Sequence, residues 1–141
     1  MCWRTKQNNR CLFPQKGHDK KVISCAAVNA ARFNRRKNIS KAEVLTLRDQ
    51  VAYQSGQVVS RTLAQNEHVS VTLFSFDKGE EISTHRSQGD AFVTCLEGVG
   101  KITVDGKEYI LKEGQSIVMP ADLPHAVYGE EAFKMLLVVI F

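Results

Sequence analysis

The side chains that could hold a metal ion or act on a small molecule gather in two segments, residues 79–98 and residues 114–125. The first segment contains His85 and Asp90, and the second ends at His125. Imidazole nitrogens suit zinc, iron, copper, nickel and manganese, and a catalytic metal commonly uses three protein ligands and leaves one position open. Two histidines alone fall short of that number, so a metal site here needs a third ligand.

The two segments together resemble the two motifs of the cupin family. The first cupin motif runs from a glycine through His-x-His and a glutamate to a second glycine, and the second motif runs from a glycine through Pro-x-Gly to a histidine. Six residues of this chain fall where the family pattern places them: Gly79, His85, Gly98, Gly114, Pro120 and His125. The resemblance covers residues 57–141 and implies the family's fold, an all-β double-stranded β-helix or jelly-roll barrel. It leaves the activity open, because this barrel hosts many unrelated functions.

The departures from the family pattern are chemical. Ser87 stands in the place of the second histidine, Ala91 in that of the glutamate, and Asp122 in that of the glycine after the proline. Aspartate tolerates the left-handed backbone conformation better than most residues, so it can replace that glycine. The resemblance implies that the retained ligands, His85 and His125, lie on neighbouring strands inside the barrel mouth. The site is then either an incomplete site for a divalent metal (zinc, iron, manganese, nickel or copper), or a decayed one in which the imidazoles hydrogen-bond to each other, to Ser87 or to water.

Asp90 is the candidate for the missing ligand, since it lies one residue before Ala91. In a regular strand a shift of one residue turns a side chain to the opposite face, so Asp90 points out of the barrel unless Gln88 and Gly89 form a bulge. In the other interpretation, Asp90 accepts hydrogen bonds from backbone amides of the turn. His68, which opens a predicted strand, is a further candidate ligand, with an exposed strand end as its alternative.

The predicted barrel interior also offers a pocket for a small molecule. Ser87 could hydrogen-bond a bound water or ligand, or instead satisfy the local backbone as a turn hydroxyl. Apolar walls are expected from Phe92 and Met119, together with Phe76 and Phe133. Two imidazoles that converge on an apolar cavity make a small organic ligand feasible.

These side chains need strands to position them, and the last two-thirds of the chain has short strand patterns separated by turns. Residues 57–63 and 68–76 are rich in β-branched and aromatic side chains and contain neither glycine nor proline, which predicts two strands. Residues 101–111 alternate apolar and polar side chains around Asp105-Gly106, which predicts a hairpin with a two-residue type I′ turn. The spacing of strands and turns independently indicates a double-sheet jelly roll.

The final strand pattern, residues 133–141, is apolar on both faces beyond Lys134, so both of its faces must be covered. The cover is either the second sheet together with a helix from the N-terminal segment, or a second copy of the chain. We predict a homodimer.

Charge divides the chain into two parts. Residues 1–41 contain eleven Lys or Arg and one acid, a net charge of +10, whereas residues 42–141 carry a net charge of −6. Within the first part, residues 24–33 are a predicted helix with Ser24 as its N-cap. We predict that residues 1–41 form a poorly ordered basic leader, the alternatives being a targeting peptide of the mitochondrial kind and sequence upstream of the true start. Its aromatic residues are sparse and the domain behind it is acidic, so nucleic acid is not an expected partner.

Composition also bears on where the protein works. No apolar run reaches the roughly 20 residues that a membrane span requires, and the start of the chain lacks the layout of a signal peptide. The four cysteines show no Cys-x-x-Cys spacing, and Cys95 lies in the apolar run 92–96, which predicts a buried thiol with a raised pKa and low reactivity. We therefore predict a reducing compartment and a cytoplasmic protein.

Two functions from different classes fit these observations. We predict a small binding, sensing or storage protein that holds a small ligand, a divalent metal or both in the barrel without turnover. The alternative is a metal-dependent enzyme of the oxygenase, isomerase or decarboxylase type with His85 and His125 as ligands, which the missing glutamate disfavours. A metal-free acid/base enzyme with His125 as the proton carrier, and an interaction module whose barrel scaffolds a dimer, are further alternatives.

Overall fold

The computed structural model describes residues 3–4, 10–12, 23–24 and 38–141. The chain divides into two compact units, Met1–Phe33 and Asn34–Phe141. Asn38 is tied to the second unit, because its side-chain amide donates a hydrogen bond of 2.8 Å to the carbonyl of Thr62 and its own carbonyl accepts one from Arg61. The structural boundary therefore lies earlier in the chain than the change of charge after residue 41.

The described residues of the first unit form short antiparallel strands in the order β1-β2-β3: β1 (Trp3–Arg4), β2 (Arg10–Leu12) and β3 (Ile23–Ser24). Ser24, which we predicted as the N-cap of a helix, is instead the last residue of β3 and lies opposite Arg10 in the ladder. This corrects the N-cap, since a residue paired in a sheet has extended backbone. Residues 25–33, the rest of the predicted helix, lie outside the described residues.

The described residues of the second unit form nine strands and one short 3-10 helix. The strands are β4 (Val58–Gln65), β5 (Val69–Phe76), β6 (Glu81–His85), β7 (Asp90–Glu97), β8 (Val99–Val104), β9 (Lys107–Lys112), β10 (Ser116–Met119), β11 (His125–Gly129) and β12 (Phe133–Ile140), and the helix is η2 (Leu47–Gln50). The predicted all-β class is therefore confirmed. No helix in the described ranges is long and apolar enough to cross a membrane.

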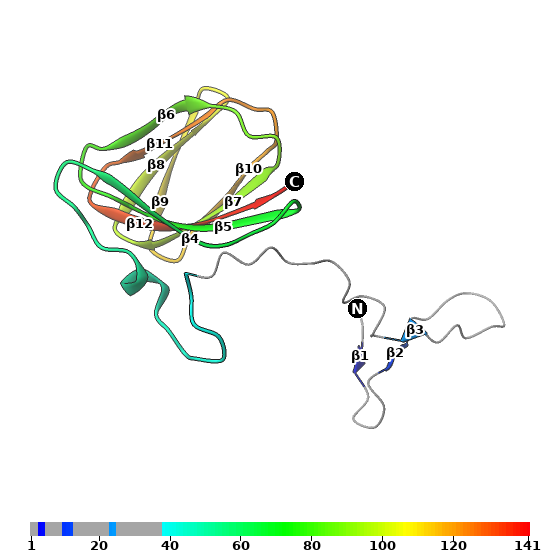
Figure 1. Cartoon of the computed structure of the whole chain (residues 1–141). Helices are drawn as coiled ribbons and strands as arrows, with labels where there is room; N and C mark the ends of the chain where they lie inside the picture. Colours follow the sequence, from blue (N-terminus) through cyan, green and yellow to red (C-terminus); the bar gives the residue numbers. More distant parts are fainter. Residues whose placement is uncertain (1–2, 5–9, 13–22, 25–37) are drawn as a thin grey trace. The chain divides into compact units, whose positions relative to one another are not determined.

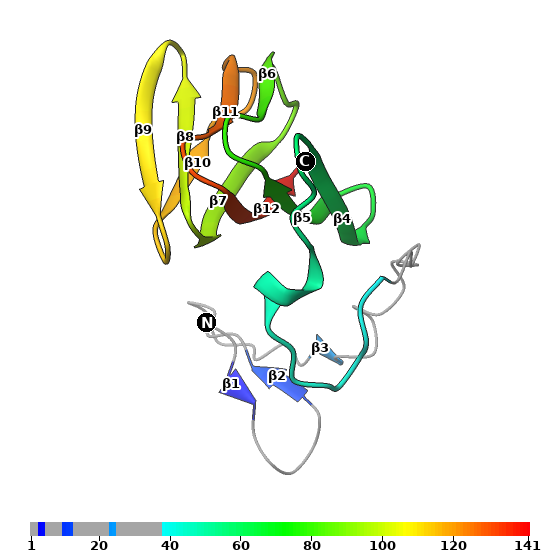
Figure 2. The ribbon, with the colours of Figure 1, turned by 90° about the vertical axis from the view of Figure 1, so that its left-hand side faces the viewer.

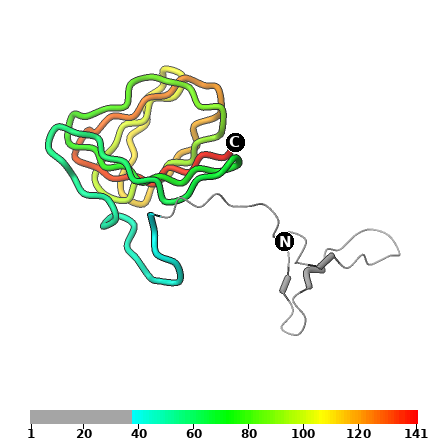
Figure 3. The backbone as a smooth tube through the Cα atoms, viewed as in Figure 1, coloured from blue at the N-terminus to red at the C-terminus, as the bar shows by residue number. Residues whose placement is uncertain are grey.

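The nine strands form two antiparallel sheets that face each other (Figure 1). One sheet has the order β10-β7-β12-β5-β4 and the other has the order β6-β11-β8-β9. Most neighbours within a sheet are distant in sequence, so the chain crosses repeatedly between the sheets and winds around a common interior (Figure 3). The perpendicular view shows the edge strands β9 and β4 at opposite sides of the unit (Figure 2). This is the predicted jelly roll.

Local sequence features set the strand boundaries. The predicted strands 57–63 and 68–76 are β4 and β5, within two residues at each end. Between β8 and β9, Asp105 and Gly106 have φ angles of 48° and 78°, the positive values that a type I′ turn requires. The predicted hairpin is therefore confirmed in both its position and its turn type.

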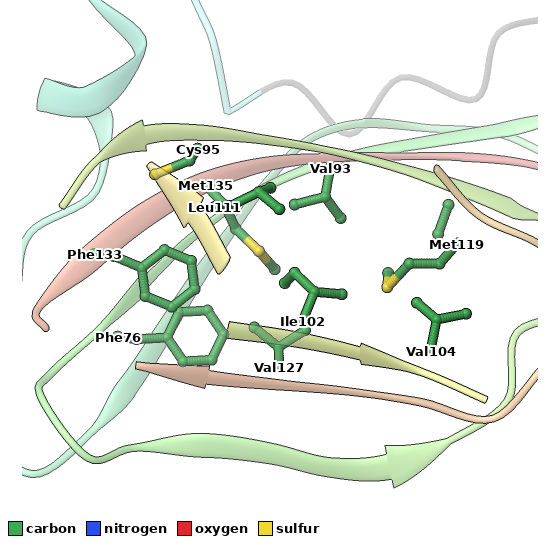
Figure 4. Close-up of a cluster of buried hydrophobic side chains, with 11 residues drawn as sticks. Phe76, Val93, Cys95, Ile102, Val104, Leu111, Met119, Val127, Phe133 and Met135 are labelled. Carbon is green, nitrogen blue, oxygen red and sulfur yellow. The ribbon is translucent and has the colours of Figure 1, made fainter. Parts of the chain in front are cut away.

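Stacked aromatic rings fill one end of the space between the sheets, which we call the phenylalanine end. Phe76 of β5 and Phe133 of β12 are fully buried, with ring centroids 4.6 Å apart and ring planes inclined by 16°. Figure 4 shows these rings at one side of the buried cluster, and Met119 with Val104 at the other side. The two ends of the barrel interior are therefore filled by different kinds of side chain.

The outer face of β12 is covered in part by the segment that precedes β4. Leu136 packs in a second hydrophobic cluster with Val51 and Leu47, outside the barrel interior. Its neighbours Met135 and Leu137 belong to the interior cluster, so the strand is covered on both faces at this point. Ile140, by contrast, is 59% exposed at the end of the strand. Cover by the second sheet and by residues of the same unit thus accounts for the middle of β12, and the predicted homodimer stays a prediction.

Candidate ligand site at the two histidines

Two histidines face each other across neighbouring strands of the four-stranded sheet. His85 is the last residue of β6 and His125 is the first residue of β11, and the two are direct partners in the ladder. Their ring centroids are 4.4 Å apart and their planes are inclined by 66°, an edge-to-face arrangement. His125 also lies opposite Val104, which Figure 4 places beside Met119 and away from the phenylalanine end. We call this region the histidine end.

The backbone holds both imidazoles through the same nitrogen. Nδ1 of His85 lies 2.9 Å from the carbonyl oxygen of Ser83, and Nδ1 of His125 lies 2.9 Å from that of Leu123. A carbonyl oxygen can only accept, so Nδ1 is the donor in both rings, and each neutral ring then keeps its lone pair on Nε2. The nitrogen that each histidine can offer to a ligand is therefore Nε2, as an acceptor.

The two rings differ in exposure. His125 is 3% exposed, whereas His85 is exposed at the mouth of the barrel. Burial lowers the pKa of His125, the hydrogen bond to the Leu123 carbonyl opposes that change, and charge on the neighbouring His85 adds a smaller lowering. The deeper imidazole is therefore neutral at neutral pH, which keeps its Nε2 free to accept.

Two connected turns form the rim beside the histidines. Asp122, which stands in place of the family's glycine, has a φ of 60° and so adopts the left-handed conformation expected for it. Its amide donates a hydrogen bond of 2.8 Å to the carbonyl of Ser87, and its carbonyl accepts one of 2.7 Å from the guanidinium of Arg86. These bonds join the loop after β6 to the turn before β11, and thereby fix the chain on both sides of the histidine pair.

Asp90 also supports this rim. It is the first residue of β7, and its Oδ1 accepts a hydrogen bond of 2.8 Å from the amide of Ala121. The next residue, Ala91, is buried and lines the barrel pocket, so Asp90 lies on the opposite face of the strand, as the register argument predicts. Gln88 and Gly89 precede the strand and form no bulge within it. The Asp90 carboxylate is thus bonded to the backbone of the turn and does not line the pocket with the two histidines.

A pocket of about 220 Å³ lies between the sheets at the histidine end. Its apolar lining residues are Phe74, Ile82, Ala91, Met119, Val127, Met135, Leu137 and Val139, and its polar lining residues are His85, Arg86, Ser87 and His125. Among these described lining residues there is no carboxylate. The pocket therefore combines apolar walls with two acceptor nitrogens, one hydroxyl and one fixed positive charge.

The residues predicted to contact a ligand are only partly brought together here. Ser87 and Met119 line the pocket. Phe92 does not, and this prediction is corrected: Phe92 is 41% exposed and lies between the buried residues Ala91 and Val93. Because side chains alternate between the faces of a strand, Phe92 points to the outer face of the sheet.

The other expected wall residues and the further candidate ligand also lie elsewhere. Phe76 and Phe133 stack on each other at the phenylalanine end and do not line the pocket. His68 precedes β5 with an exposed side chain, and its Nε2 lies 3.3 Å from the carboxylate of Glu67. The alternative given for His68, an exposed strand end, is the one that the structure shows.

Cys95 belongs to the interior wall rather than to the site. It is 1% exposed, and its sulfur lies 3.5 Å from the carbonyl oxygens of Glu97 and Gly98. Burial raises the pKa of the Cys95 thiol, so the thiolate is disfavoured. The predicted buried thiol with a raised pKa is confirmed.

Arg86 is the pocket residue that sequence reasoning missed. It follows the last residue of β6, and continued alternation after the inward His85 would turn it to the outside. The strand ends at His85, however, and the guanidinium reaches the carbonyl of Asp122 and lines the pocket. The available signal was its place between His85 and Ser87, inside the first motif.

The donor set does not fit a complete metal centre. The two Nε2 atoms could provide two ligands to a divalent metal. The other two positions of the family pattern hold the neutral hydroxyl of Ser87 and the methyl group of Ala91, and neither replaces an imidazole or a carboxylate. In the part of the chain that the structure describes, no three His, Cys, Asp or Glu side chains gather as a metal site.

Comparison with known proteins agrees with this fold. Residues 72–141 match the family model described as a Cupin domain. A conserved protein of unknown function from Streptococcus pyogenes has 52% sequence identity and a TM-score of 0.72, covering 74% of this chain and 91% of that chain. A cupin superfamily protein from Desulfitobacterium hafniense DCB-2 has 34% identity and a TM-score of 0.72, covering 76% of this chain and 98% of that one.

A more distant similarity exists to a characterised enzyme. Dimethylsulfoniopropionate lyase DddW from Ruegeria pomeroyi is 27% identical over 78 residues, which is 55% of this chain. The chain spans about half of that lyase's length, 51%.

Proposed function

This chain belongs to the cupin superfamily, and we propose that its barrel binds one small, largely apolar molecule at the histidine end without turning it over. One observation carries the proposal: apolar walls from both sheets enclose a pocket of about 220 Å³ in which two imidazoles keep Nε2 available. A binding pocket of this kind combines a mostly apolar lining with a few converging polar groups. The role is that of a binding, sensing or storage protein.

The size of the pocket limits the ligand. A cavity of about 150 Å³ in another protein holds one benzene molecule, so a pocket of about 220 Å³ is somewhat larger than one ring requires. That volume suits a single ring or a short branched chain with one or two polar groups. Expulsion of pocket water by such a body supplies the driving force for binding, and the imidazoles orient the polar group.

Two methionines make the proposal testable. Met119 and Met135 both line the pocket, and Met1 is the only other methionine in the chain. Selective labelling of methionine methyl groups with carbon-13 therefore gives two pocket signals, from Met119 and Met135, and one signal from Met1 in an NMR spectrum. We expect small oxygenated ring compounds to shift the Met119 and Met135 signals in a saturable way.

Ala91→Leu is the matched control, because the longer side chain grows into the pocket from a buried wall position. It should abolish these shifts while the spectrum stays that of a folded barrel. A His85→Ala/His125→Ala variant keeps the walls and loses both acceptors, so it should retain weak binding without orientation of the polar group. Compounds that bind equally well to the Ala91→Leu protein, or that shift neither pocket methionine, would contradict the proposal.

A metal-dependent enzyme is the second candidate, and the similarity to a dimethylsulfoniopropionate lyase is the observation that favours it. The test is the loss of dimethylsulfoniopropionate, followed by proton NMR, with each of the divalent ions of zinc, iron, manganese, nickel and copper. The binding proposal expects no loss beyond that seen with His85→Ala/His125→Ala. Consumption that requires both histidines would replace binding by catalysis.

A further inference from the structure

We propose that the molecule bound at the histidine end is a small hydroxycarboxylate, with its carboxylate on Arg86 and Ser87 and its hydroxyl donating to one of the two histidine Nε2 atoms. This inference rests on the proposed binding function and names the chemical class of the ligand. It follows from the charge of the pocket, the donor and acceptor roles of its polar groups, and the walls behind them.

The charge of the pocket selects an anion. Arg86 carries a full positive charge at neutral pH, and no acid lines the pocket among the described residues. Its hydrogen bond at 2.7 Å goes to the carbonyl of Asp122, a neutral group that orients the guanidinium without cancelling its charge. Arg48, by comparison, is paired with the carboxylate of Glu113 at 3.1 Å. Within the described ranges Arg86 has no such ion pair, so it attracts an anion and repels a cation.

The remaining donors of Arg86 fit a carboxylate. A guanidinium has five N–H donors in a planar fork that matches the two oxygens of a carboxylate, and the bond to Asp122 uses Nη1. Ser87 lies beside it, and its Oγ accepts the amide of Gly89 at 3.3 Å, which leaves the hydroxyl proton free to donate. Arg86 and Ser87 therefore both offer donors at the lining of the pocket.

The two imidazoles require the opposite role from the ligand. Because Nδ1 of each ring donates to a carbonyl, each neutral ring offers a lone pair on Nε2. A carboxylate also only accepts, so it cannot satisfy these lone pairs. A hydroxyl group can satisfy one of them, since it has one proton to donate. A ligand that carries both groups matches the donor side and the acceptor side of the pocket together.

The walls determine the rest of the ligand. Behind the polar mouth, the lining is formed by aliphatic side chains such as Ile82, Val127 and Leu137. In about 220 Å³ there is room for one ring and its substituents, but not for an extended chain. Polyhydroxylated molecules would bury hydroxyls without partners against these walls, which is unfavourable. The ligand class is therefore a compact apolar body with one carboxylate and one hydroxyl.

The experiment compares compounds of nearly equal shape that differ in charge and in the hydroxyl group. Benzamidine, benzamide, benzoate and the three isomers of hydroxybenzoate are titrated into the full-length protein near pH 7.5, and affinity is read from the Met119 and Met135 methyl signals. We expect benzamidine not to bind, benzoate to bind about tenfold tighter than benzamide, and at least one hydroxybenzoate to bind tighter than benzoate.

Two charge variants locate the effect. Arg86→Gln should weaken benzoate and hydroxybenzoate binding about tenfold and leave benzamide unchanged. Lys112→Gln removes one positive charge at the end of β9, outside the pocket lining, and should change nothing. Retained benzoate affinity in Arg86→Gln, or equal affinities for benzoate and benzamide, would overturn the hydroxycarboxylate inference and leave pocket binding intact. If no compound of any charge moved the pocket methionines, the binding proposal would fall with it.

Discussion

The same two sheets enclose both ends of the barrel interior, but the two ends are packed differently. At the phenylalanine end, Phe76 and Phe133 stack 4.6 Å apart and fill the space between the sheets. At the histidine end, β7 contributes the small side chain of Ala91, and a pocket of about 220 Å³ remains beside His125. One end therefore provides stability and the other a site, since well-packed rings leave no room for a ligand and a pocket lacks some of the contacts of a filled core.

Truncation at each end should therefore differ most in its effect on stability. Phe133→Ala removes a fully buried ring and its stacking partner's contacts, and we expect a loss of about 3–5 kcal/mol in the free energy of unfolding. Leu137→Ala enlarges an existing pocket, so its cost should lie near or below the lower end for such changes, about 2 kcal/mol. Urea unfolding followed by circular dichroism measures both free energies. Circular dichroism is preferred to tryptophan fluorescence because Trp3, the one tryptophan, lies in the first unit. Equal losses would show that the ends are packed alike.

Larger side chains should also destabilise the two ends to different extents. A Cβ at Gly100 would lie 2.5 Å from the nearest carbon of the Phe133 ring, so Gly100→Ala should destabilise the fold by about 1–3 kcal/mol. Ala91→Leu has pocket space to occupy and should cost less than about 1 kcal/mol while it blocks ligands. The same unfolding measurement gives the two values. A larger loss of stability in Ala91→Leu than in Gly100→Ala would mean that the pocket has no space for a longer side chain at position 91.

Acid should weaken the histidine end in particular. The folded-state pKa of His125 lies below its ordinary value of about 6.5, so between these two pKa values the unfolded chain binds more protons than the folded chain. The free energy of unfolding should therefore decrease as the pH falls through about 6.5 toward the folded-state pKa. His125→Gln removes this contribution, and its unfolding curves between about pH 7.5 and pH 5 should show a smaller pH dependence than the parent. Parallel pH dependence in both proteins would contradict the assignment.

The interior wall at the phenylalanine end should also protect the Cys95 thiol from alkylating reagents. Cys95 is buried in the interior cluster and burial raises the pKa of its thiol, so brief alkylation of the native protein near pH 8 should leave it unmodified. Peptide mass mapping identifies the site, and the same treatment in urea serves as the positive control. Rapid labelling of Cys95 in the folded protein would show that this wall opens more readily than the structure indicates.

A measurement of self-association tests the outer face of the five-stranded sheet, which contains β7 and β10. Phe92 and Val118 are 41% and 52% exposed and lie opposite each other in the ladder of β7 and β10. Neighbouring exposed apolar side chains favour the predicted homodimer, and light scattering after gel filtration measures the mass. Phe92→Glu should then shift the protein toward the monomer. A monomeric parent would leave these side chains as exposed surface.

Sequence reasoning reached the fold because its signals are local. Asp105-Gly106 marks a type I′ turn by conformational preference alone, and Asp122 takes the left-handed conformation that its place in the family pattern requires. The period of two along a strand also placed Asp90 on the outer face. Phe92 lies two residues after Asp90, so the same period places its side chain on the outer face as well. The prediction that Phe92 lines the pocket was therefore inconsistent with this period, and the structure shows Phe92 exposed.

The polar part of the site depends on contacts that no local signal contains. Arg86 reaches the pocket because β6 ends at His85 and because a turn 36 residues later offers the carbonyl of Asp122. The histidine tautomers likewise depend on the carbonyls of Ser83 and Leu123, whose directions follow from the folded backbone. The retained histidines could be predicted from the motif, whereas the charge and the acceptor role of the pocket required the structure.

The most direct test of the account is the protonation of the two imidazoles, because the site depends on Nε2 being the free acceptor. Long-range proton–nitrogen NMR correlations of the histidine rings near pH 7.5, assigned with His85→Gln and His125→Gln, distinguish the two tautomers. Both rings should carry the proton on Nδ1 and leave Nε2 unprotonated. A proton on Nε2 in place of Nδ1 in either ring would contradict the hydrogen bonds to Ser83 and Leu123 and remove the acceptor side of the proposed site.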